Sequence, residues 1–181
     1  WVGDLHEAPI GILIALVEEA ARIEGPVHSD EVVSRIRDAF GLKRAGNRIQ
    51  RAVEAAIGAA VATGRIESVV DFLSIPNAPV RVRDRSSATS QTLRRAEMLP
   101  PSEIRSAVVD VVRRNFGATS DQVVQAVSRM FGIRSTGANV RNVIQKQIDE
   151  ALEGGVLTTQ AGVLMCVADD ELSNEELVRE K

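Results

Sequence analysis

Apolar residues recur at steps of three and four along much of the chain, which is the spacing of amphipathic helices. The first such stripe lies in residues 10–24 and consists of Ile10, Leu13, Ile14, Val17, Ala20 and Ala21. Gly25 and Pro26 predict the end of this helix, because glycine suits a left-handed cap and proline cannot continue the helix.

A second and a third helix are predicted on either side of a short turn. The second helix starts at His28 or Ser29, and its apolar stripe ends at Phe40. Residues 41–46 form the turn, with a glycine at each end, and the third helix then runs to about Ala62. The apolar side of the third helix consists of Ile49, Val53, Ala56, Ile57, Ala60 and Val61.

Two short strands and a linker follow the third helix. Residues 65–68 and 72–75 predict strands around a tight turn. Three helices followed by such a hairpin indicate a winged helix, with the hairpin as its wing. Residues 76–98 contain an alternating Val-Arg run at 80–85 and a Ser- and Thr-rich stretch at 86–92, which together predict a basic linker.

The whole pattern then returns at an offset of 91 residues without a gap. FGLKRAG at residues 40–46 becomes FGIRSTG at residues 131–137, and Gly64 corresponds to Gly155. Because the stripes, the turn glycines and the hairpin stay in register, we infer an internal duplication. The predicted fold is mainly α, with tandem duplicated winged helix-turn-helix domains, each made of three helices and a short β-hairpin. The predicted boundaries are 7–75 for repeat 1, 76–98 for the basic linker, 99–168 for repeat 2 and 169–181 for an acidic tail.

Composition and charge are compatible with this picture. The chain has 181 residues, of which 44% are hydrophobic and 26% charged, as in ordinary globular proteins. The formal net charge of −3 divides into +5 for residues 26–168 and −8 for the two flanks. The central excess of positive charge is compatible with a nucleic-acid partner. The absence of Tyr and the small number of aromatic residues argue against recognition of single strands by rows of stacked bases.

The sequence favours a cytoplasmic protein. Cys166 is the single cysteine, so no internal disulfide is possible, which fits a reducing compartment. No apolar run reaches the roughly 18 residues of a membrane span, and nothing resembles a signal peptide. Because the chain begins with Trp1 rather than Met, we expect it to be an excerpt from a longer polypeptide.

Four segments carry a resemblance to a known family: FGLKRAGNRIQRAV at 40–53, TGRI at 63–66, VRDRS at 82–86 and LPPSEI at 99–104. Over most of residues 7–168, the chain resembles a bacterial family of unknown function. Its members form the C-terminal region of large superfamily-one DNA helicase-like proteins, often together with an endonuclease-like domain related to very-short-patch repair enzymes. The resemblance implies that this chain is a helicase-associated accessory part. It also implies an ATP-dependent helicase as the parent, whose remainder is a partner.

Candidate nucleic-acid contacts come from both repeats and from the linker. Residues 43–51 carry four cations and no acid, which suits phosphate gripping and base reading in a major groove, although a solvated helix face explains them too. The second repeat keeps one cation of the turn and is closer to neutral, so it makes neutral backbone contacts or is plain surface. The linker arginines fit phosphate tracking, an edge strand or a charged linker equally well. The candidate residues are Lys43, Arg44, Asn47, Arg48, Arg51, Arg81, Arg83, Arg85, Arg134, Ser135, Asn139 and Lys146.

No pattern in the chain indicates catalysis. The phosphate-cradling motif GxxxxGK[ST] is absent, and His6 and His28 have no Cys or His at metal-ligand spacing, so no cofactor or metal is expected. Cys166 has no accompanying His and is predicted to be a buried apolar residue. We therefore predict a non-catalytic DNA-binding module that uses the third helix of repeat 1 and the linker. The alternative is a protein–protein docking module, intramolecular or oligomeric, that uses the winged-helix surfaces.

Overall fold

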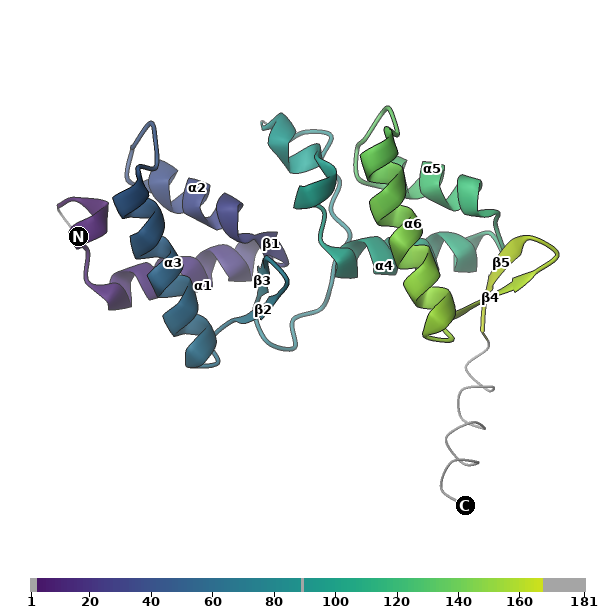
Figure 1. Ribbon diagram of the computed structural model, residues 1–181, viewed down its shortest axis with the longest axis horizontal. Helices are drawn as coiled ribbons and strands as arrows, with labels where there is room; N and C mark the ends of the chain where they lie inside the picture. Colours follow the sequence, from purple (N-terminus) through teal and green to yellow (C-terminus); the bar gives the residue numbers. More distant parts are fainter. Residues whose placement is uncertain (1–2, 89, 168–181) are drawn as a thin grey trace, which may run out of the picture. The chain divides into compact units, whose positions relative to one another are not determined.

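The computed structural model describes residues 3–88 and 90–167, and the chain divides into two compact units (Figure 1). Unit 1 is Trp1–Val80 and unit 2 is Arg81–Lys181, so the division falls inside the predicted linker. Within the described residues the chain is mainly helical, with six α-helices and small antiparallel sheets. None of these helices is long and apolar enough to cross a membrane. The predicted acidic tail, residues 169–181, lies outside the described residues.

Unit 1 contains one short 3-10 helix, three α-helices and a small sheet. The helices are η1 (Leu5–Glu7), α1 (Ile10–Glu24), α2 (Ser29–Ala39) and α3 (Asn47–Ala62). The strands are β1 (Val27–His28), β2 (Glu67–Val69) and β3 (Phe72–Ser74), in the antiparallel order β1-β3-β2. The Nδ1 atom of His28 accepts a hydrogen bond from the Asp30 N–H at 3.2 Å, so His28 is the N-cap of α2 and the helix itself begins at Ser29.

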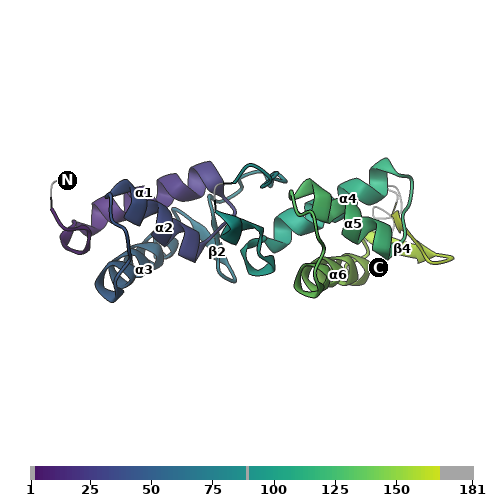
Figure 2. The ribbon, with the colours of Figure 1, turned by 90° about the horizontal axis from the view of Figure 1, so that it is seen from above.

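The core of unit 1 lies between α1, α2 and α3 (Figures 1 and 2). Its buried side chains include Leu13, Val17, Ala21, Val32, Ile36, Val53, Ala56, Ala60, Ile66 and Leu73. The predicted stripes are therefore confirmed at most positions. Ile10 and Val61 are the corrections, because they are 50% and 37% exposed. Ile10 is the first residue of α1, and Val61 lies about 80° around α3 from Val53, off the buried side.

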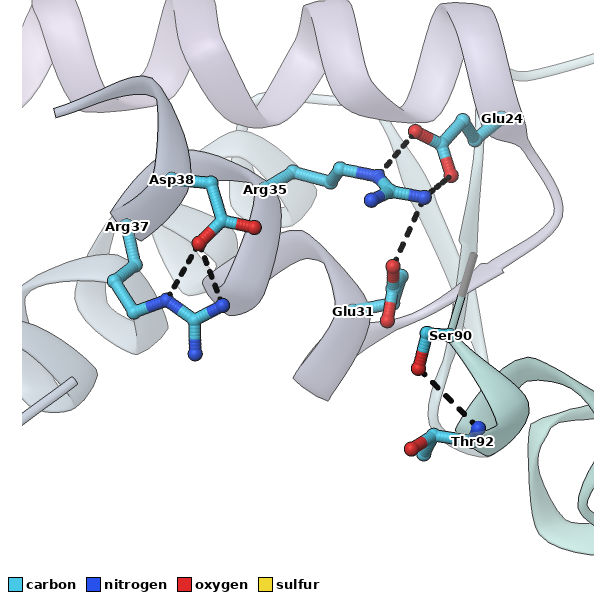
Figure 3. A network of polar contacts seen from close by, with 7 residues as sticks. All are labelled: Glu24, Glu31, Arg35, Arg37, Asp38, Ser90 and Thr92. Atoms are coloured by element: carbon cyan, nitrogen blue, oxygen red, sulfur yellow. Dashed lines mark hydrogen bonds and ion pairs between the residues drawn. The ribbon is translucent and has the colours of Figure 1, made fainter. Parts of the chain in front are cut away.

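A partly buried polar network joins α1 to α2 in unit 1 (Figure 3). The guanidinium of Arg35 lies between two carboxylates, with Nε 2.6 Å from Glu24 Oε1 and Nη2 3.0 Å from Glu31 Oε1. Burial raises the pKa of Glu31 above its ordinary value; Arg35 opposes this shift, and repulsion from Glu24 and Asp38 adds to it. The cation of Arg35 is therefore committed to neutralising carboxylates inside the unit.

Unit 2 shows the same order of helices. It contains η2 (Gln91–Arg94), η3 (Ala96–Met98), α4 (Pro101–Arg114), α5 (Ser120–Met130), α6 (Ala138–Glu153), β4 (Leu157–Gln160) and β5 (Val163–Cys166). Both ends of η3, α5 and α6 lie 91 residues after the ends of η1, α2 and α3. In place of a strand like β1, a single antiparallel bridge joins Ala118 to Leu164.

The core of unit 2 is built from the helices and the hairpin. Its most buried side chains include Ile104, Val108, Val124, Val127, Phe131, Ile144, Ile148, Leu157 and Leu164. Cys166 was predicted to be buried and is half-buried, with Sγ 3.8 Å from the Val109 carbonyl oxygen. Within this unit α6 packs against α4 and α5 (Figure 2), as α3 does against α1 and α2 in unit 1.

Candidate nucleic-acid interface

The turn after α2 and the start of α3 present five exposed polar residues. Lys43 and Arg44 lie in the irregular turn, ahead of the N-cap Gly46, so Arg44 is not part of the helix. The other three are in the first two turns of α3, whose buried side consists of Val53, Ala56 and Ala60. We call this set the basic face; it consists of Lys43, Arg44, Asn47, Arg48 and Arg51, and all five side chains are exposed.

The cations of unit 1 separate into paired and unpaired sets. The unit has eight Lys and Arg residues. Four of them lie outside the basic face and each has a carboxylate oxygen within 3.2 Å; they are Arg22, Arg35, Arg37 and Arg65. The four cations of the basic face have no ion pair or hydrogen bond to any residue that the structure describes. The uncompensated positive charge of unit 1 is therefore concentrated in nine consecutive residues, 43–51.

This arrangement does not favour the stability of α3. The N-cap Gly46 makes no side-chain cap, and the first turn of α3 has no acid, whereas α2 begins with Asp30 and Glu31. Arg48 is the second residue of α3, and a cation at the positive end of a helix dipole costs about 0.3–1 kcal/mol. Because the charge of Arg48 opposes the dipole of the helix that carries it, an external anion would stabilise this end of α3.

The corresponding positions of unit 2 carry less free charge. Arg134, Ser135 and Asn139 are exposed, and they lie 91 residues after Lys43, Arg44 and Arg48. Thus two of the three cations are replaced by neutral side chains. Along α6, the Lys146 Nζ atom lies 3.9 Å from Glu150, and Arg141 pairs with Asp121 at 2.5 Å.

The predicted linker arginines have a different environment from the one that phosphate tracking requires. Arg83 Nε lies 2.8 Å from Glu103 Oε1, and Arg85 Nη2 lies 3.1 Å from Glu103 Oε2. The Glu103 side chain is fully buried and the Arg85 side chain is 8% exposed. Burial lowers the pKa of Arg85, and Glu103 opposes this shift. Of the three arginines, Arg81 alone has an exposed side chain with no partner among the described residues. Arg83 and Arg85 are therefore removed from the set of candidate nucleic-acid contacts.

Residues 82–86 form a strap across the turn between α5 and α6. The Arg85 guanidinium lies 5.0 Å from the centre of the Phe131 ring, and the Arg85 N–H donates to the Phe131 carbonyl at 3.3 Å. A Cβ atom at Gly132 would lie 2.3 Å from the Ser86 nitrogen. The sequence signal for the strap is Glu103, a charged residue beside the apolar stripe of α4.

The strap predicts unequal costs for the same substitution in the two turns. Gly132→Ala is expected to destabilise unit 2 by about 1–3 kcal/mol more than Gly41→Ala destabilises unit 1, because it adds overpacking to backbone strain. Both glycines have positive φ, +73° and +68°, but nothing lies within 4 Å of a Cβ at Gly41. Amide hydrogen exchange at increasing urea concentrations gives the free energy of unfolding of each unit and so measures both costs. Equal costs would contradict a closely packed strap.

One cluster of possible metal ligands occurs among the described residues. Asp4, His6 and Glu7 bring ligand atoms within 4.8 Å of one another around η1. Asp4 and Glu7 are exposed, and exposed acidic groups of this kind are common in proteins without a metal. The cluster therefore supports no functional assignment.

Comparison with known proteins places similarity in unit 1. A family model described as a protein of unknown function (DUF3320) matches residues 3–51. The match begins before η1 and ends at Arg51, so it contains the whole basic face. It confirms a similarity to a family of unknown function over these residues. No curated protein and no solved structure matches the chain.

Proposed function

We propose that this chain is a non-catalytic DNA-binding module and that unit 1 makes the principal contact through the basic face. Three helices followed by a hairpin, with β1 completing the sheet, support a winged helix in unit 1. The common 91-residue offset of the helices supports a tandem of two such domains. In helix-turn-helix proteins the helix after the turn enters the major groove, and α3 occupies that place.

The observation that carries the proposal is the set of four unpaired cations in residues 43–51. Exposed cations without carboxylate partners bind phosphates and release the counterions of DNA. Arginine also reads guanine edges, and the amide of Asn47 suits adenine or the phosphate backbone. The local charge, rather than the net charge of −3, decides this interaction, since salt screens distant acids.

The resemblance to the C-terminal region of helicase-like proteins supports an accessory role. In that context unit 1 holds DNA for an ATPase that another part of the parent protein supplies. The linker contributes through Arg81, whose side chain is exposed, while Arg83 and Arg85 serve unit 2. The ATPase chemistry itself belongs elsewhere, because the sequence has no phosphate-cradling motif.

A salt titration of the full chain tests the proposal. Binding to a fluorescein-labelled duplex is measured by anisotropy between 50 and 200 mM NaCl. Four phosphate contacts predict a slope of about −3.6 in log K against log salt, or roughly a 100-fold loss of affinity over this range. Affinity that does not change with salt, or no binding at 50 mM, would overturn the proposal.

A further inference from the structure

The second part of the predicted linker is folded and belongs to unit 2. It forms η2 and η3, and Ala96, Met98 and Leu99 at its end are buried. In Figures 1 and 2 this segment is drawn in teal just before α4, and it lies beside the end at which α6 begins. Because η3 packs against α6, the side chains of η2 and η3 are held in place beside that helix.

Two neighbouring arginines of this segment carry charge that unit 2 leaves uncompensated. Arg94 is the last residue of η2, and Arg95 is the exposed N-cap residue of η3. Neither side chain has an ion pair or a hydrogen bond to any residue that the structure describes, although the exposed Glu97 is only two residues from Arg95. Six other cations in the described part of unit 2 have a carboxylate oxygen within 3.9 Å; they are Arg83, Arg85, Arg105, Arg114, Arg141 and Lys146.

The offset of 91 residues shows that the two units place their positive charge differently. Arg95 corresponds to Asp4, and each of the two is the N-cap residue of its 3-10 helix. Arg94 corresponds to Gly3. Unit 2 thus has two cations where unit 1 has a glycine and an acid, whereas the turn before α6 has lost two of the three cations found in unit 1. Both arrangements put free cations beside the start of the third helix of the unit.

We propose that unit 2 has a DNA contact of its own, in which Arg94 and Arg95 bind the phosphate backbone beside the start of α6. Guanidinium groups pair with phosphate in a bidentate geometry. The first turn of α6 has no acid, so the exposed Ser135 and Asn139 can donate hydrogen bonds to the same backbone without a carboxylate nearby in that turn. With two cations against four, this contact is weaker than that of the basic face. The inference rests on the proposed DNA binding but uses no residue of unit 1.

An NMR titration of the isotope-labelled full chain tests this contact. The probe is a duplex of about 12 base pairs, a little more than one helical turn. It is added in excess at 50 mM NaCl, so that each unit can bind a duplex of its own. The amide signals of Arg94, Arg95 and Asn139 are expected to shift. Arg94→Gln combined with Arg95→Gln should lower the affinity reported by Asn139 at least about tenfold, because two phosphate contacts contribute about 1.8 to the slope of log K against log salt.

Arg113→Gln combined with Arg114→Gln is the matched control. It removes the same charge from unit 2 at exposed residues of α4, and Arg113 lies about 18 Å along that helix from its first residue. This variant should leave the affinity reported by Asn139 within about threefold of its original value. An equal loss in both double variants would overturn the inference, because unit 2 would then respond only to its total charge.

The signals of the basic face separate this inference from the proposed function. If Lys43, Arg44 and Arg48 shift while Arg94 and Arg95 do not, the inference is overturned and the proposed function stands. If neither set shifts, both fail. A shift in unit 2 alone would support the inference and contradict the principal role of unit 1. A polyglutamate peptide is the second probe: if it shifts the unit 2 signals at a lower concentration than the duplex does, the ligand is an acidic protein segment and the inference is overturned.

Discussion

Arg44→Glu combined with Arg48→Glu is expected to abolish DNA binding while leaving unit 1 as stable as before or more so. The double change converts two free cations into two anions at the centre of the basic face. At low salt, the loss of two phosphate contacts and the added repulsion should lower affinity by more than about 100-fold. Glutamate at position 48 also lies near the positive end of the α3 dipole, where an acid adds about 0.3–1 kcal/mol of stability.

The opposite directions of the two effects make this result diagnostic. Anisotropy measures the affinity, and urea unfolding measures the free energy of unfolding on the same preparation. A matched control is Arg113→Glu with Arg114→Glu, which changes the net charge equally at two exposed residues of α4. This control should keep its affinity within about threefold at 150 mM salt. An equal loss of affinity in both double variants would show that DNA senses the overall charge and not the basic face.

The helices could be predicted from the sequence because their determinants are local. The ends of α1 at Ile10 and Glu24 follow from an apolar stripe and the Gly25-Pro26 pair that terminates it. Strand β1 could not be predicted in the same way. It has two residues, and its partner, β3, lies some 45 residues further along the chain. A strand that short has no periodicity of its own, so its pairing depends on where α1 and α2 place it.

The basic face and the strap show the same distinction at the level of side chains. The four cations of residues 43–51 are contiguous, so their excess of charge was visible in the sequence. That they lack partners depends on where the acids of unit 1 lie in space. The alternation of Val and Arg in residues 80–85 fits a linker, an edge strand or a phosphate track. The structure brings Arg83 and Arg85 to Glu103, which lies 20 and 18 residues away in sequence.

Glu103→Ala is expected to destabilise unit 2 by about 3–5 kcal/mol, because it leaves the buried guanidinium of Arg85 without its carboxylate. The strap should then detach from the turn after α5, exposing Arg83 and Arg85 to trypsin. Urea unfolding measures the first effect, and the rate of cleavage within residues 82–86 measures the second. Arg105→Ala is the matched control, since its ion pair with Glu150 is exposed and removal should cost at most about 1 kcal/mol.

A triple variant separates the need for charge from the need for coverage. Replacing Glu103, Arg83 and Arg85 together with leucine removes every charge of the network, and a buried ion network can be exchanged for apolar residues with little loss of stability. The triple variant should therefore recover most of the stability lost in Glu103→Ala and keep the strap resistant to trypsin. If it is as unstable as Glu103→Ala, charge pairing itself holds the strap.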